Sequence, residues 1–346
     1  MNNNRLIRSN SMTTKSNIMK SSQYSIPVIL VSSLLCLGLQ AATTDKKAAT
    51  VKDSKDSTAM VAPKQKSFDT PELAAASLIQ AATAFEVPAL KEILGQGSDD
   101  IIASQDPVMD KERALAFAAK AKEQHKIEID PKNPNRAIIT VGEDAFPLPI
   151  PIVKKNEKWS FDTKTGAKEI LLRRIGANEL DAIAICQGFC EAQHEYAGKK
   201  HDGAMVNQYA QRIISTPGKQ DGLAWQNADG AWEGPVGEGI AKALEQGYSK
   251  KDKPQPYHGY YFKVLKGQGP AAPLGQLDFM VGGAMIGGFA LAATPAQYQV
   301  TGVKSFIVSH TGIVYEKDLG ANSIELFQKM ELYNPDKSWQ PTQDQW

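Results

Sequence analysis

The sequence predicts an α+β fold made of two successive units, each with helices packed on an antiparallel sheet. Helical patterns precede alternating strand patterns twice along the chain, in residues 70–162 and again in residues 165–316. Short turns join neighbouring strand patterns, and such turns favour antiparallel pairing. We therefore expect an N-terminal α+β domain at 67–164 and a C-terminal α+β domain at 165–340.

The bulk composition of the 346-residue chain is that of a globular protein. Apolar residues make up 42% of the sequence, which is enough to build a core. The 39 basic and 38 acidic residues nearly cancel, so the basic excess that drives nucleic-acid binding is missing. Only Cys186 and Cys190 follow the N-terminal leader, which is too few for a disulfide-built scaffold.

The N-terminus has the pattern of a secretory signal peptide over residues 1–41. The 14-residue apolar run Ile26–Leu39 is short for a bilayer span, which takes about 20 residues. Basic residues without any acid precede this run, and small residues follow it. We expect cleavage after Ala41 and export to the periplasm or the medium. A retained membrane anchor is the alternative, and Met12 and Met19 are alternative starts to Met1.

A disordered linker is expected at residues 42–66. This segment contains no aromatic residue and is rich in Lys, Asp, Ala and Thr. It buries too little apolar surface to offset its conformational entropy. No later run is long and apolar enough to cross a membrane, so we expect no stable span in the mature chain.

Three helices are expected at the start of the N-terminal domain. Thr70 is an N-cap, and Pro71 stands at the first helical position. The helix that follows places apolar residues on one face. These residues are Leu73, Leu78, Ala81, Ala82 and Phe85. A second helix is expected from Pro88 to Gly95, and a third from Asp110 to about His125.

Strands complete the N-terminal domain. Residues 126–130 and 136–141 alternate on either side of a turn and predict a hairpin. Residues 148–152 alternate with prolines, which cannot donate to a β-ladder, and so predict an edge strand. A turn at 155–158 leads to a closing strand at 159–162. The order of helices and strands resembles the cone-shaped, nuclear-transport-factor-like folds.

The C-terminal domain is predicted to begin with helices and to end in a sheet. A short helix covers Ile170–Ile175, and Asn178 caps a longer helix that stops at Gly198. Further helices are expected at 206–214 and 239–246. Strands are expected at 260–265, 277–281, 285–293, 303–309 and 313–316, with Thr311-Gly312 as a tight turn between the last two.

The sequence contains no catalytic, metal or cofactor motif. It lacks a phosphate-binding glycine loop, a nucleophile elbow and the histidine pair of zinc peptidases. Its five histidines lack metal-ligand spacing, so no metal and no other cofactor is predicted. Cys186 and Cys190 lie one helical turn apart, where side-chain carbons are roughly 5–6 Å apart, too far for an unstrained disulfide. We expect both thiols to be buried and reduced.

Two loops hold the candidate binding residues. Tyr257, His258 and Tyr260 belong to an aromatic cluster that forms either a pocket wall or part of the sheet core. Lys219 and Asp221 lie in the loop Ser215–Gly222. A deep pocket that brings these residues together would indicate a ligand site, whereas a filled core would indicate an interaction module.

Eight stretches in a fixed order resemble one protein family. They are residues 68–72, 159–162, 173–180, 209–212, 215–223, 256–262, 287–291 and 312–320. Over residues 67–340 the chain resembles the exported bacterial family named domain of unknown function 2950. The resemblance implies export and the extent of the fold, and it implies no particular activity. Relatives have a segment like a calcium loop after the long helix, but Lys199–Ala204 has one carboxylate, so no calcium site is expected.

The C-terminal half also resembles the globular part of type IV pilin-like proteins. The resemblance lies in residues 178–179, 259–262, 293–295, 302–306 and 310–313. A pilin polymerises through an apolar N-terminal helix, whereas the corresponding helix here begins in mid-chain and carries Glu191, His194 and Glu195. Filament assembly by that route is therefore not expected.

These observations lead to two functional hypotheses. The first is a non-catalytic interaction or binding module of the cell envelope, because the exported chain has no catalytic constellation. Its partner would be an envelope protein or a cell-wall component. The alternative is an envelope hydrolase or a small-ligand binder that uses the loops Tyr257–Phe262 and Ser215–Gly222.

Overall fold

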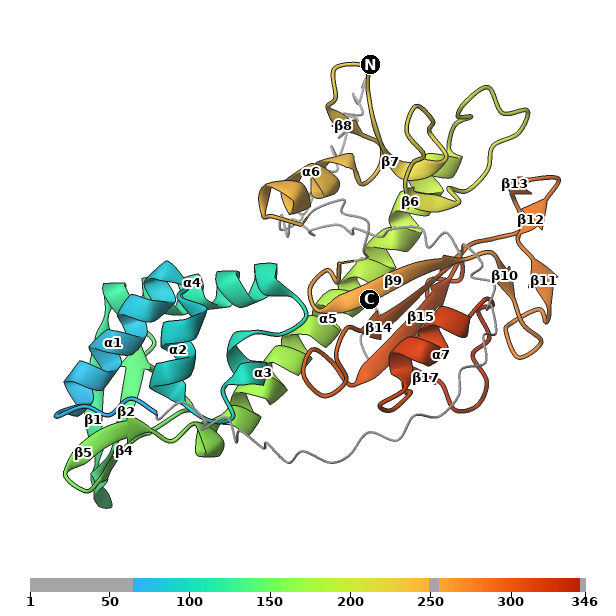
Figure 1. Ribbon diagram of the computed structural model, residues 1–346. Coiled ribbons are helices and arrows are strands. Elements are labelled where there is room, and N and C mark those ends of the chain that lie inside the picture. The colour runs from blue at the N-terminus through green and yellow to red at the C-terminus, as the bar shows by residue number, and fades with distance from the viewer. Residues whose placement is uncertain (1–64, 249–254, 343–346) are drawn as a thin grey trace, which may run out of the picture.

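One long helix joins two regions of the protein, each with its own sheet and its own apolar core (Figure 1). The computed structural model describes residues 65–248 and 255–342. The predicted signal peptide at 1–41 lies outside the described residues, as does the expected linker up to residue 64. We call residues 65–162 the N-terminal region and residues 198–342 the C-terminal region. Helix α5 (Thr163–Ala197) belongs to both.

The N-terminal region has four helices, α1 (Pro71–Ala84), α2 (Val87–Leu94), α3 (Asp99–Ile102) and α4 (Pro107–Glu123). Three of the four, α1, α2 and α4, pack on its sheet, and the short α3 contacts α2 and α5. As predicted, Thr70 caps α1 by accepting a hydrogen bond from the Leu73 amide, and α2 ends at Gly95. Leu73 itself is 51% exposed, so its predicted place on the buried face is wrong. Helix α4 begins before Asp110, because the buried Asp106 side chain caps it at the Met109 amide.

The N-terminal sheet is antiparallel, with the order β1-β2-β4-β5 and with β3 paired to β2. Its strands are β1 (His125–Asp130), β2 (Asn133–Val141), β3 (Phe146–Pro147), β4 (Ile152–Lys155) and β5 (Lys158–Phe161). The hairpin of β1 and β2 is confirmed. The predicted edge position of residues 148–152 is wrong, because β4 begins after the last proline, keeps its amide donors and lies between β2 and β5.

Helix α5 is continuous over 35 residues, so the predicted break between Ile175 and Asn178 is wrong. Asn178 lies inside the helix, where its side chain bonds to distant residues instead of capping an end. Asp162 caps the helix. Gly166 allows its first turns to approach the sheet, since a Cβ there would lie 2.6 Å from the Ile150 Cα.

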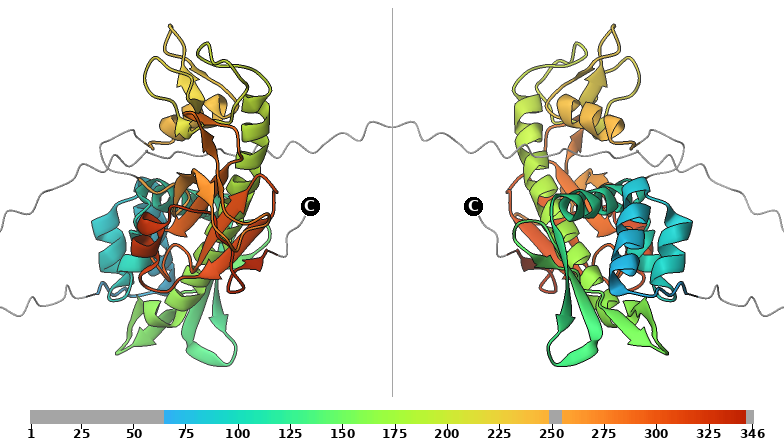
Figure 2. Two further views of the ribbon diagram at one scale, coloured as in Figure 1. Left: turned by 90° about the vertical axis from the view of Figure 1, so that its right-hand side faces the viewer. Right: turned by 90° about the vertical axis from the view of Figure 1, so that its left-hand side faces the viewer.

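The C-terminal sheet is antiparallel, with the order β17-β16-β15-β14-β9. Its strands are β9 (Tyr260–Leu265), β14 (Ala290–Pro295), β15 (Lys304–Ser309), β16 (Val314–Asp318) and β17 (Gln340–Pro341). Helices α5 and α7 (Ser323–Lys329) cover opposite faces, so every residue of β14 is buried (Figure 2). The predicted turn at Thr311-Gly312 joins β15 to β16, with Gly312 in the left-handed conformation.

Smaller elements lie around the C-terminal end of α5 (Figure 1). They are β6 (Arg212–Ile214), β7 (Gly222–Gln226), β8 (Trp232–Glu233), α6 (Gly237–Glu245), β10 (Gly267–Gln268), β11 (Leu277–Asp278), β12 (Met280–Val281) and β13 (Ala284–Met285). The prediction of a helix at 206–214 is wrong, because backbone amides of this segment donate hydrogen bonds to the Gln193 side chain and to the Met285 carbonyl. The predicted helix near 239–246 is α6. The strands expected at 277–281 and 285–293 are divided among β11 to β14, with a left-handed glycine turn at Gly282-Gly283.

Among the residues that the structure describes, none of the helices has the length and apolarity to cross a bilayer.

Candidate binding site

The N-terminal region contains a cavity of about 420 Å³ between its helices, strand β3 and the start of α5. Its walls are mainly apolar side chains from α1, α2, α4 and the segment 146–150. They include Leu78, Ala82, Leu90, Leu94, Ala114, Phe117, Leu148 and Ile150. Alanines at 82, 114 and 177 leave space that larger side chains would fill. Small residues on α1, α4 and α5 therefore contribute to the open space.

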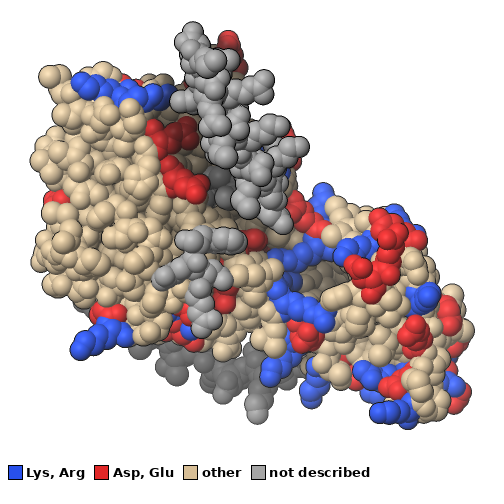
Figure 3. Space-filling view, turned by 180° about the vertical axis from the view of Figure 1, so that it is seen from behind, with Lys and Arg blue, Asp and Glu red and all other residues tan. Residues whose placement is uncertain are grey.

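One end of this cavity carries charge. Asp110 and Arg113 come from α4, and Arg173 and Arg174 come from α5. Arg173 is exposed, pairs with Glu169 and stacks over the Phe146 ring. In the surface view, Lys and Arg side chains gather around a hollow between the larger and the smaller part of the molecule (Figure 3). An apolar interior with a cationic end is therefore the main feature of the site.

Arg174 and Asp110 form a buried ion pair at the charged end. Arg174 is 5% exposed, its Nη2 lies 3.5 Å from Asp110 Oδ1, and it donates to the carbonyls of Asp100 and Ile101. Burial raises the pKa of Asp110, although Arg174 and Ser104 oppose this shift. Burial lowers the pKa of Arg174, but a guanidinium stays protonated. Its Nε has no hydrogen-bond partner within the described residues.

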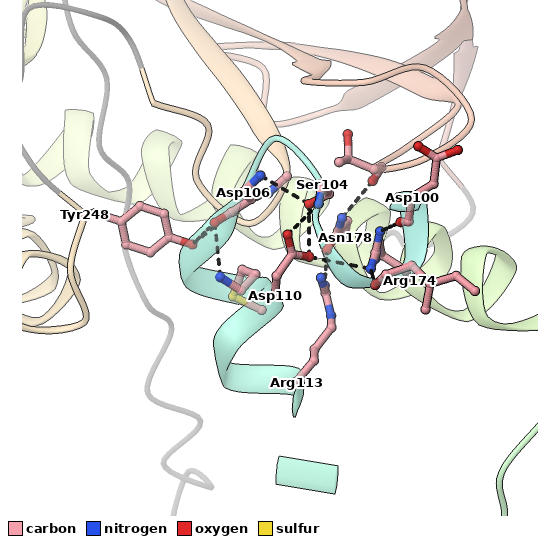
Figure 4. A network of polar contacts seen from close by, with 12 residues as sticks. Asp100, Ser104, Asp106, Asp110, Arg113, Arg174, Asn178 and Tyr248 are labelled. Atoms are coloured by element: carbon pink, nitrogen blue, oxygen red, sulfur yellow. Dashed lines mark hydrogen bonds and ion pairs between the residues drawn. The ribbon is translucent and has the colours of Figure 1, made fainter. Parts of the chain in front are cut away.

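Polar contacts extend from this end of the cavity into the C-terminal region (Figure 4). Arg113 Nη2 donates to Asn178 Oδ1 at 2.6 Å, and Asn178 Nδ2 donates to the Thr301 carbonyl at 2.7 Å. The Asp106 carboxylate accepts hydrogen bonds from the Tyr248 hydroxyl and, at 2.8 Å, from the Gly259 amide. We call this set of contacts the junction network. It fixes the charged end of the cavity against the second core.

Tyr257, His258 and Tyr260 lie at the junction and in the C-terminal core. Tyr257 and Tyr260 are 1% and 0% exposed, and the Tyr260 hydroxyl donates to the Lys304 carbonyl. His258 and Gly259 form a tight turn with positive φ at both residues, and His258 Nδ1 lies 2.7 Å from Asp181 Oδ2. Gly259 is required there, since a Cβ would collide with the Asn178 side chain. These side chains fill a core.

Lys219 and Asp221 do not lie beside the aromatic residues Tyr257 and Tyr260. Asp221 accepts from the amide and hydroxyl of Thr216 and pairs with Arg212, while Lys219 is exposed. Their loop is anchored where the Tyr196 hydroxyl donates to the Gln220 carbonyl. Tyr196, which anchors this loop, and Asp181, which is the partner of His258, are fifteen residues apart on α5. This separation corresponds to roughly 22 Å along the helix. The structure therefore does not bring the two candidate loops together, and their role in binding stays a prediction.

A family profile for proteins of unknown function, DUF2950, matches residues 65–342. The chain belongs to the DUF2950 family. Comparisons with curated proteins and with solved structures found no match. The matched segment of this DUF2950 protein spans both regions, so the cavity and the junction network lie inside it.

Within the described residues of this DUF2950 protein, the cysteines are Cys186 and Cys190, and both are free and buried on α5. Cys186 is 0% exposed, and Cys190 Sγ lies 3.5 Å from the Ser309 carbonyl oxygen. Burial raises the pKa of both thiols, that of Cys190 to about 12. Among the described residues, no group of three or more His, Cys, Asp or Glu side chains could hold a metal ion.

The cavity was not predicted from the sequence, although one signal for it is present. Arg174 stands one turn after Ile170 and one turn before Asn178, on the side of α5 that is buried. An arginine on the inner face of a helix needs an acceptor or a ligand, because a buried charge is costly when unpaired. The empty volume itself has no local sequence pattern.

Proposed function

We propose that this DUF2950 protein is an exported, non-catalytic binding module that holds a small apolar ligand in the N-terminal cavity. The cavity is the observation that supports this proposal, because its volume of about 420 Å³ falls in the range of roughly 300–1,000 Å³ typical of ligand sites. The signal pattern at residues 1–41 supports export. Export would place the site among envelope or cell-wall components.

The size and the lining of the cavity favour a medium-sized apolar guest. An apolar cavity of about 150 Å³ admits benzene, so this cavity has room for roughly seventeen non-hydrogen atoms by the same proportion. Its wall atoms lack van der Waals partners on one side, and a guest would restore those contacts. Binding would also remove the guest's apolar surface from water.

The charged residues of the site support binding over acid–base chemistry. Asp110 is the acid among the lining residues in the described part of the chain, and it is held by Arg174 and Ser104. The C-terminal region serves in this proposal as the scaffold that fixes α5. We also propose that the C-terminal region is similar to the globular part of pilin-like proteins and that the N-terminal region has a cone-like fold.

A neutral fluorescent probe, N-phenyl-1-naphthylamine, tests the proposed site in the mature protein. Ala114→Trp would fill the cavity from α4, whereas Ala116→Trp, two residues further on the same helix, points to solvent. We expect saturable binding to the unmodified protein, weakened about tenfold or more by Ala114→Trp, and unchanged by Ala116→Trp. No saturable binding, or equal binding by the two variants, would overturn the proposal.

A further inference from the structure

We propose that the ligand is an amphiphile with a single carboxylate headgroup, whose tail fills the cavity and whose headgroup binds Arg113 and Arg174. This inference rests on the proposed function and adds the chemical class of the ligand. It comes from the charged end of the cavity, which the apolar walls alone do not explain.

The balance of charge at that end favours an anion. Three arginines and one aspartate are the charged residues that line the cavity. Arg173 is occupied by Glu169 at the surface, and Asp110 compensates one of the remaining two arginines. Among the lining residues, one positive charge is therefore left without an acidic partner; Asp100 and Asp106, which do not line the cavity, also act on Arg174. A neutral ligand would gain nothing from this excess.

Arg174 offers a buried donor that the protein leaves unused. Its Nη atoms are engaged by the carbonyls of Asp100 and Ile101 and by Asp110, but its Nε has no partner within the described residues. Unsatisfied buried donors are rare because each one costs free energy. A ligand oxygen in the cavity would supply the missing acceptor.

Arg113 completes a place for a second oxygen. It is half-buried, and its Nη2 donates to Asn178, while a guanidinium has five N–H donors in all. In the close view, Asp110, Arg113 and Arg174 converge from α4 and α5 (Figure 4). Arg113 lies near enough to Arg174 to lower the pKa of its guanidinium further. A carboxylate between them would reduce this repulsion and accept charge-assisted hydrogen bonds.

The test compares decanoate with 1-decanol, which have the same chain length and differ in the charge of the headgroup. Each is used to displace N-phenyl-1-naphthylamine from the mature protein at low salt. We expect decanoate to bind at least tenfold more tightly than 1-decanol. Arg113→Gln, which keeps a donor toward Asn178, should reduce this preference to about threefold or less and leave the binding of 1-decanol unchanged.

Matched variants keep the result interpretable. Arg113→Lys retains the charge and should keep part of the preference for decanoate. Arg136→Gln removes an arginine that pairs with Asp130 on the β1–β2 hairpin, away from the cavity lining, and should change nothing. If Arg113→Gln does not fold, the salt dependence of binding to the unmodified protein serves as the test instead. Added salt should weaken decanoate binding and leave 1-decanol binding constant.

The outcomes separate this inference from the proposed function. Equal affinities for decanoate and 1-decanol, with probe binding intact, would overturn the headgroup and leave the apolar site standing. Decylamine binding as tightly as decanoate would also overturn it. Loss of preference in Arg136→Gln would place the headgroup elsewhere and contradict the assignment to Arg113 and Arg174. Failure of the probe to bind the unmodified protein would instead reject the site itself.

Discussion

The two regions of this protein share a design of helices on an antiparallel sheet, but they fill their cores differently. The largest fully buried side chains of the C-terminal core are aromatic, and they include Phe189, Phe279, Phe289, Phe306 and Tyr333. Those of the N-terminal core are the isoleucines 139, 150 and 152. The aromatic C-terminal core contains rings packed edge to face. The N-terminal core, which includes Phe68, Trp159 and Phe161 beside its aliphatic residues, borders the cavity of about 420 Å³.

This difference indicates that the two regions have different structural roles. An open cavity persists only if the surrounding elements cannot collapse into it, since protein interiors are otherwise close-packed. Helix α5 meets that requirement, because one part of it is fixed in the aromatic core and another part lines the cavity. The filled region thus stabilises the wall of the hollow one. The predictions below test this relation, from the largest expected effect to the smallest.

The first prediction concerns the buried ion pair that holds the charged end of the cavity. Arg174→Met leaves the Asp110 carboxylate buried without its partner. Removing one member of a buried pair costs about 3–5 kcal/mol, so we expect a loss of that size in the free energy of unfolding. Urea unfolding monitored by circular dichroism measures it.

The control for this prediction is the double variant Arg174→Met, Asp110→Asn. It also removes the unpaired charge, so it should recover part of the lost stability. A single-variant loss below about 1 kcal/mol, in the range of a surface pair, would show that the pair does not hold α4 against α5.

The second prediction compares equal substitutions in the two cores. Ala182 on α5 and Ala82 on α1 are both helical and are 1% and 2% exposed, but Ala82 lines the cavity. Ala182→Leu overpacks a filled core and should cost about 1–3 kcal/mol. Ala82→Leu extends into empty space and should cost less than about 1 kcal/mol while weakening probe binding. Equal losses of unfolding free energy would contradict the hollow N-terminal core.

Elements with local signals were predictable from the sequence, whereas the elements set by distant contacts were not. Thr70-Pro71, Gly95 and Thr311-Gly312 mark their helix ends and turn correctly because capping and tight turns depend on adjacent residues. Asn178 was misread as a cap, because its partners Arg113 and Thr301 are far away in the sequence.

The candidate site was less predictable than the fold. Tyr257 and Tyr260 stood out as aromatic residues, yet their rings fill the junction and the C-terminal core. The cavity depends on which small side chains of α1, α4 and α5 face one another, and helical periodicity does not report volume. Arg174 alone was a usable signal, because a buried guanidinium requires specific partners.

The third prediction concerns the thiols of the filled core. Replacing both Cys186 and Cys190 by Ala removes core volume, so it should cost on the order of 1–2 kcal/mol and leave the fold unchanged. In the unmodified protein we expect both thiols to be reduced and, being buried, to react with iodoacetamide only after denaturation. Mass spectrometry without reductant measures this. A mass two daltons light, with alkylation blocked until reduction, would indicate a disulfide and contradict the helix geometry.

The smallest expected effect is a pH dependence that originates in the filled region. The Nδ1 atom of His310 is buried without a partner in the described residues, and the ring lies edge-on to Phe279 and Phe289. Burial lowers the pKa of His310 in the folded protein, and His194 lowers it further. In the unfolded chain the pKa returns to about 6.5. As the pH falls through that value, the unfolded chain binds a proton before the folded protein does.

Stability should therefore decrease as the pH is lowered from about 7.5 through 6.5, and level off below the folded pKa of His310. His310→Asn removes the titrating group, so urea midpoints measured across this range should fall less steeply than those of the unmodified protein. His125→Asn, on the exposed strand β1 of the hollow region, should keep the original slope. If His310→Asn keeps that slope as well, the pH dependence does not arise from the packing of His310 against the aromatic core.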